Sequence, residues 1–114
     1  MQYHVRGVAS EAVTASMEME ELFPWIEAVV HPSLETLAKM AKDGKVSGGT
    51  EAGARVLNFV FDASSNEEAG QILRSLPMWG AVNWSLTPLQ SFHSAVEQDR
   101  AAIARAKSMG AGKH

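Results

Sequence analysis

Two residues at the start of the chain have the types and spacing that proton-transfer chemistry needs. His4 and Arg6 are two positions apart in the alternating segment QYHVRGV, so a strand would project both from one face. An imidazole exchanges a proton near neutral pH, and a guanidinium pairs with a carboxylate through its planar fork. We expect His4 to be catalytic and Arg6 to bind substrate. The alternatives are a structural histidine and, more commonly for arginine, a surface or interface ion pair.

A second pair, Glu27 and His31, is four residues apart and would share one face of a helix. The two side chains could act as base and acid. They are too few for a metal site, because zinc sites take at least three protein ligands. We therefore expect catalytic roles for this pair, no metal and no cofactor.

Three further residues are candidates for binding a substrate. Asn58 interrupts an apolar segment, and a buried amide must find hydrogen-bond partners, either a ligand carbonyl or a neighbouring strand. Trp25 follows a proline and Trp79 lies in a predicted turn, so both are placed to line the mouth of a pocket.

The elements that position these residues follow from periodicity. Alternating segments predict strands at 2–8, 45–49, 54–63 and 81–89, the middle two joined by a turn. Helical spacing covers 17–45 and 64–76; Pro24 and Pro32 should split the first into an irregular piece and a firmer helix from about Ser33. Ser65 and Glu68 form a capping box, and Ser94 with Glu97 a possible second one.

This β-α-β-β-α-β order predicts an α+β fold, a ferredoxin-like sheet with both helices on one face. The bare face, with Val56 and Val60 or their alternates Leu57 and Phe59, should be covered by a second copy about a two-fold axis. We divide the chain into a domain at 1–91 and a C-terminal helical arm and tail at 92–114, which we expect to lie over the neighbouring subunit.

Composition restricts the class of protein. The 114 residues include no cysteine, which excludes disulfides and thiol chemistry, and no apolar run long enough to span a membrane. A net charge of −3 gives no electrostatic footprint for nucleic acid. We expect a cytoplasmic protein with no nucleic-acid or membrane partner.

Three segments, MQYHVRG, LNFVFDASSNEEAGQILRSLP and MWGAVNWSLTPL, resemble in order the muconolactone isomerase family. The positions that match the family directly are His4, Asn58, Phe61, Asp62, Leu76 and Pro77. The resemblance implies a dimeric α+β barrel and cofactor-independent isomerisation of a small unsaturated lactone acid, a step in aromatic compound catabolism.

We therefore expect an isomerase that acts by proton transfer, with His4 and Asn58 facing one pocket between sheet and helices. Arg6 or Asn58 would stabilise the enolate oxygen. The alternatives are a non-catalytic ligand-binding or accessory dimer, and a cofactor-free monooxygenase or cyclase on the same barrel fold.

The sequence predicts an assembly of two chains, or a multiple of two, because a sheet with helices on one face leaves apolar positions uncovered. Light scattering at micromolar concentration should give at least twice the chain mass of 12.3 kDa. A particle of single-chain mass would contradict the prediction.

Overall fold

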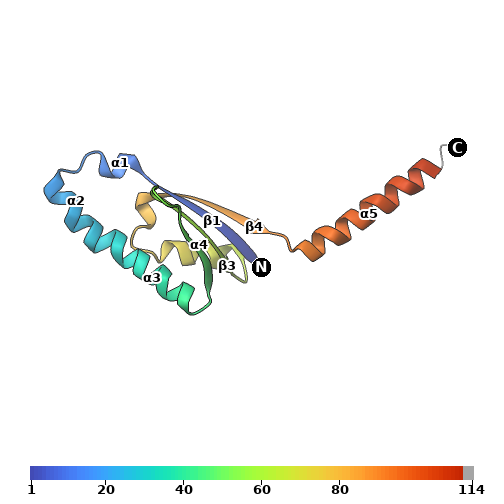
Figure 1. Cartoon of the computed structure of the whole chain (residues 1–114), viewed down its shortest axis with the longest axis horizontal. Helices are drawn as coiled ribbons and strands as arrows, with labels where there is room; N and C mark the ends of the chain where they lie inside the picture. Colours follow the sequence, from blue (N-terminus) through green and yellow to red (C-terminus); the bar gives the residue numbers. More distant parts are fainter. Residues whose placement is uncertain (112–114) are drawn as a thin grey trace.

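The computed structural model describes residues 1–111 and shows an α+β fold built on a four-stranded antiparallel sheet (Figure 1). The strands are β1 (Gln2–Ala9), β2 (Val46–Thr50), β3 (Val56–Asp62) and β4 (Val82–Leu89), in the spatial order β2-β3-β1-β4. β1 and β3 are adjacent and central, as the sequence predicts. β4 is an edge strand, which suits Pro88, since a central strand would need its missing N–H.

Side-chain alternation gives the sheet one buried and one open face. On the buried face Tyr3 and Val5 of β1 pack with Leu57, Phe59 and Phe61 of β3, all less than a tenth exposed. The alternative set, with Val56 and Val60, therefore lies on the open face, where both valines are half-buried. The Tyr3 hydroxyl donates to Asn66 Oδ1 at 2.6 Å and so links the sheet to the helix that follows β3.

Gly7 of β1 is buried because the Trp84 ring from β4 lies across it. A Cβ at this position would lie 2.7 Å from Trp84 Cζ3 and 2.9 Å from Val82 Cγ1. The pair Gly7 and Trp84 face each other in the antiparallel register. The small residue thus lets the indole pack flat on the sheet beneath the helices.

The helical layer begins with α1 (Glu11–Thr14) and continues as α2 (Met19–Trp25), η1 (Ile26–Val30) and α3 (His31–Lys42). The predicted break at the two prolines is wrong, because these last three elements form one continuous run, whereas the predicted change from an irregular piece to a regular helix is confirmed, with α3 beginning at His31. Between them η1 is a π-helix, in which the His31 N–H donates to the carbonyl of Ile26, five residues earlier. Such a wide turn accommodates Pro32, which has no N–H to give to the carbonyl four residues before it.

Ser33 fastens this run to the rest of the fold. It is fully buried, and its hydroxyl donates to the Val29 carbonyl at 2.8 Å while accepting from the Met78 N–H at 2.9 Å. Met78 precedes a short 3-10 helix, η2 (Trp79–Ala81), which leads into β4. One hydroxyl therefore joins two segments 45 residues apart.

The second helix, α4 (Asn66–Arg74), packs Ala69 and Leu73 into the same core as the strands. Its start confirms the predicted cap, since the Glu68 N–H donates to Ser65 Oγ at 3.1 Å. The predicted hairpin is also confirmed: β2 and β3 pair antiparallel, and Gly53 in the turn has a φ of 78°, a conformation that favours glycine.

The last helix, α5 (Phe92–Ala111), projects from the end of β4 as an arm (Figure 1). It stretches the molecule to 76 Å along one axis against 30 and 27 Å along the others. The predicted Ser94 cap is wrong: Ser91 Oγ accepts from the Ser94 N–H at 3.0 Å, so the helix starts earlier. The last part of the predicted tail, 112–114, lies outside the described residues.

The length and polarity of a helix decide whether it can cross a bilayer. Within residues 1–111, every helix is too short or too polar to cross a bilayer.

Replacing Ser33 with alanine should lower the free energy of unfolding by about 1–3 kcal/mol, because it leaves the buried Met78 N–H without an acceptor. Thr36→Ala is the matched control. Its hydroxyl makes the same kind of bond to the Pro32 carbonyl, but on the exposed side of the same helix. We expect the control to stay within about 0.5 kcal/mol of the parent in urea denaturation. Equal losses in both variants would contradict the role of Ser33.

Candidate functional site

A cavity of about 310 Å³ lies between the helical run and the buried face of the sheet; we call it the helix–sheet pocket. Trp25, Ile26 and Val30 contribute one wall. The opposite wall comes from Gly7 and Ala9 of β1 and from the beginning of β3. The remaining lining residues are Ser10, Thr14, Leu22, Leu34, Thr50, Ala54, Arg55, Val56, Leu57, Met78, Ala81 and Val82.

The lining is mainly apolar with a few polar groups. Ser10, Thr14 and Thr50 supply hydroxyls, and Arg55 is the one charged residue among the lining residues that the structure describes. Pockets for small organic molecules have this composition, mostly hydrophobic and aromatic with a few polar groups that orient the ligand. A guanidinium pairs with a carboxylate, so the lining suits a small apolar acid.

The helical run is tied, beside the pocket, to the segment that leads through η2 into β4. Ser33 is tied to Met78, and the flanking residues Leu34 and Met78 both line the pocket. On the other side of this tie Trp25, the last residue of α2, and Ile26, the first residue of η1, line the pocket. A π-helical turn shifts the direction of side chains along a helix, and such turns are frequent at functional sites.

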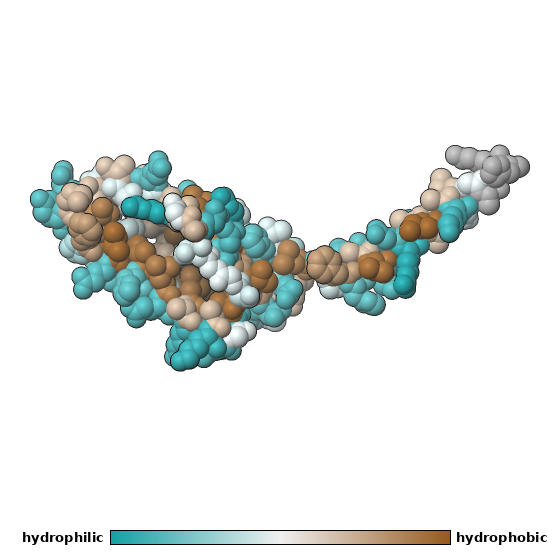
Figure 2. All heavy atoms as spheres, viewed as in Figure 1, coloured by the Kyte–Doolittle hydropathy of each residue, from teal (hydrophilic) through white to brown (hydrophobic). Residues whose placement is uncertain are grey.

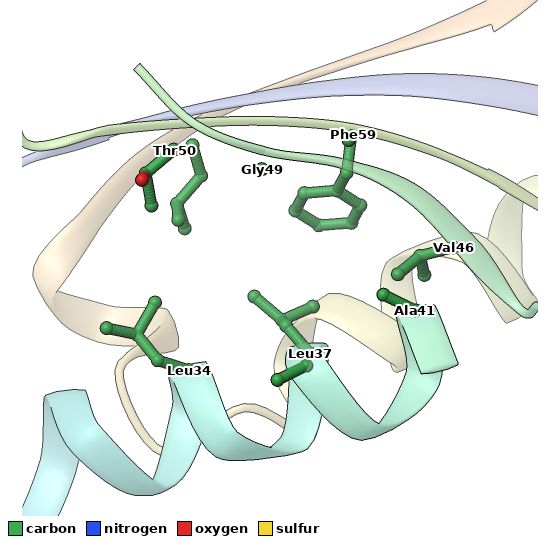
Figure 3. A pocket seen from close by; sticks show the side chains of 10 residues that line it. Leu34, Leu37, Ala41, Val46, Gly49, Thr50 and Phe59 are labelled. Carbon is green, nitrogen blue, oxygen red and sulfur yellow. The ribbon is translucent and has the colours of Figure 1, made fainter. Parts of the chain in front are cut away.

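A second hollow, of about 260 Å³, lies beside the pocket between α3 and the hairpin of β2 and β3; we call it the α3–β2 groove (Figure 3). Leu34, Leu37 and Ala41 of α3 point toward Phe59 and Val46 across it (Figure 3). Leu34, Thr50 and Leu57 line both hollows.

His4, Arg6 and Asn58 lie together on the open face of the sheet. Arg6 faces Asn58 in the β1–β3 register, and His4 faces Val60 on one side and Thr87 on the other. The expectation that His4 and Asn58 face a cavity between sheet and helices is wrong, since neither lines the pocket or the groove. Alternation decides this, because Tyr3, Val5 and Gly7 take the face that the helices cover.

A carboxylate that sequence reasoning missed joins two of these residues. Glu51, in the turn after β2, accepts from Asn58 Nδ2 at 2.6 Å and lies 3.7 Å from Arg6 Nε. The side chains of Arg6 and Glu51 are about half exposed, so this ion pair adds little to stability. The hairpin register brings Glu51 there, and no local pattern in the sequence indicates it.

Glu27 and His31 do not form the predicted pair. His31 Nε2 lies 2.6 Å from Glu35 Oε1 instead, with both side chains about two-thirds exposed. Glu27 lies in the π-helix and is also exposed. The wider π turn between the two residues changes the spacing that a regular α-helix would give. Among the described residues there is no group of three or more His, Asp or Glu that could hold a metal ion.

The two tryptophan candidates separate. Trp25 lines the pocket, and its role in binding substrate stays a prediction. Trp79 is 41% exposed outside it: the Arg74 guanidinium lies 5.2 Å from its ring, and its carbonyl accepts from Trp84 Nε1. Ser10, Thr14 and Arg55 were missed because they come together from three separate segments at one end of the sheet.

Comparison with known proteins adds no assignment: the chain matches no protein-family model and no curated protein.

Proposed function

We propose that this protein binds a small, mainly apolar organic acid or lactone in the helix–sheet pocket. The observation that carries the proposal is the lining itself, an apolar cavity of about 310 Å³ with one charged residue, Arg55, and three hydroxyl-bearing residues. The absence of any His, Asp, Glu or Lys from these lining residues favours ligand binding over proton transfer at this place. Of the functions that the sequence suggests, this proposal corresponds to the non-catalytic ligand-binding dimer.

We further propose that the subunit is ferredoxin-like and that two subunits form a dimeric α+β barrel like that of the muconolactone isomerases, which the sequence resembles. The strand order β2-β3-β1-β4 supports the first statement. The open sheet face, where Val8 and Val60 are only half-buried, supports the second. Two such faces packed together would remove these valines from water.

A test of ligand binding uses the tryptophan that lines the pocket. Titration with unsaturated lactones and aromatic acids should change the tryptophan fluorescence in a saturable way and raise the melting temperature. Trp25→Phe should remove most of the fluorescence response, whereas Trp79→Phe should keep it, because Trp79 does not line the pocket. A response that survives in Trp25→Phe and is lost in Trp79→Phe would place the ligand elsewhere.

Arg55→Leu should weaken binding of an acid about 10- to 100-fold, since a hydrogen bond to a charged group contributes about 1.5–3 kcal/mol. Arg74→Leu is the control, because this guanidinium lies over Trp79 outside the pocket. Isothermal titration calorimetry with the acid and its neutral ester separates charge from shape. An unchanged dissociation constant for the acid in Arg55→Leu would contradict a role for the guanidinium.

The second candidate function is a cofactor-independent isomerase whose site lies on the open sheet face. The arrangement of Arg6, Asn58 and Glu51 favours it: the Glu51 carboxylate lies between two donors that could hold a substrate carboxylate in its place. His4 lies on the same face, two residues before Arg6 on β1. In a face-to-face dimer these groups would be enclosed between two sheets, where His4 would move a proton and Arg6 or Asn58 would stabilise the enolate oxygen.

If His4 moves the proton, His4→Ala should lower the rate constant for isomerisation about 10²- to 10⁴-fold while the particle mass stays unchanged. Thr87→Ala is a neighbouring control, since Thr87 faces His4 in the β1–β4 register. Turnover of a lactone acid is followed by absorbance. Full activity in His4→Ala would show that this histidine has only a structural role and would reject the second candidate function.

A further inference from the structure

The arm α5 carries apolar side chains that nothing in its own chain covers. Phe92 is 92% exposed, Val96 47%, Ile103 54% and Met109 67%, and Ala95, Ala102 and Ala106 extend the same stripe. The helix of 20 residues would be about 30 Å long. In proteins most of the stability of a helix comes from tertiary packing of its apolar face. The apolar stripe of α5 therefore requires an apolar surface against which to pack.

The α3–β2 groove is an apolar surface that lacks an occupant. Its lining residues are all uncharged, and Leu34, Ala38 and Ala41 of α3 are exposed along it. Figure 2 shows apolar side chains across the body and again along the arm. The open sheet face is less suitable for an apolar helix, because it presents Arg6, Ser85 and other polar side chains.

We propose that α5 of one copy docks in the α3–β2 groove of a second copy, and that the exchange is reciprocal. The arm cannot reach the groove of its own chain as it stands, because it leaves the end of β4 and points away from the body (Figure 1). A copy related by a two-fold axis places its groove beside the arm, and the same contact then forms a second time with the two copies exchanged.

Charge along the two helices sets the orientation. On α5 Asp99 precedes Lys107, whereas on α3 Glu35 precedes Lys42. An antiparallel arrangement places Asp99 beside Lys42 and Lys107 beside Glu35, with nearly equal spacings along the helices. A parallel arrangement would bring like charges together. In the antiparallel register Ile103 lies opposite Ala38.

The inference rests on the dimer of the proposed function but not on its ligand. If two sheets close into a barrel about an axis along the barrel, the β4 edge of one subunit lies beside the β2 edge of the other. The arm follows β4, and β2 forms one wall of the groove. The arm would therefore start beside the groove that it fills.

Cysteine cross-linking tests the contact directly, because the chain has no cysteine of its own. Ile103→Cys and Ala38→Cys, purified separately, mixed and mildly oxidised, should give a covalent dimer on a non-reducing gel. Ala101→Cys with Ala38→Cys is the control for the helix face, because Ala101 lies on the side of α5 opposite Ile103. Val96→Cys with Ala38→Cys is the control for register, since Val96 lies about 10 Å along the helix from Ile103.

Cross-linking of the Ile103 and Ala38 variants, with little from either control pair, is the expected result. Three results would overturn the proposal: no covalent dimer from that mixture, a covalent dimer from Ile103→Cys alone, or efficient cross-linking of Ile103→Cys with Ser85→Cys on the open sheet face. Circular dichroism shows that each variant folds.

Light scattering of the full chain separates this inference from the proposed function. A particle of single-chain mass would reject the proposed dimer together with the arm exchange. A dimer that forms without the cross-link would reject the arm exchange alone. A cross-linked dimer that binds no acid or lactone would reject the ligand alone and leave the arm in its groove.

Discussion

The buried hydroxyl of Ser33 is the point on which the helical layer depends. The Ser33 side chain is fully buried, and it bonds to Val29 within the helical run and to Met78 across the fold. Buried polar groups have to be paired, so this hydroxyl and the Met78 N–H each require the other. The bond therefore fixes how the run crosses the sheet and, through the neighbouring Leu34 and Met78, where the pocket ends.

Two hollows lie along the helical run. One is beneath η1 and the other beside the second half of α3, and Leu34, next to Ser33, lines both. Cores are normally packed as densely as organic crystals, so cavities of this size need an explanation. A ligand in the helix–sheet pocket and a helix in the α3–β2 groove would each bury apolar surface that the single chain leaves open.

Each face of the sheet thus carries a candidate site for a ligand or for a second copy of the chain. The buried face depends on Gly7, whose lack of a side chain admits the Trp84 ring, and it carries the pocket. The open face carries His4 and the hydrogen-bonded group of Arg6, Asn58 and Glu51. The two candidate functions belong to opposite faces of one sheet, which makes them separable by mutation.

The strands, the hairpin and the start of α4 follow from the sequence, because their signals are local. The period-two pattern of QYHVRGV, the cap at Ser65 and the turn at Gly53 each act over a few residues. Which alternating set faces the helices was not determined, since β3 offers Leu57 and Phe59 on one side and Val56 and Val60 on the other. The site followed the same division: Trp25 was found from its place beside Pro24, whereas Arg55 and Glu51 acquire their neighbours only when distant segments meet.

The position of His4 away from the pocket follows from the folded structure alone, because the assignment of faces depends on what the helices cover. The folded structure also shows that the helical run continues through Pro24 and Pro32, and at Pro32 a π turn accommodates the missing donor. Local propensity acts along the chain, but burial is a property of the assembled fold, and for that reason the elements could be read from the sequence while the site could not.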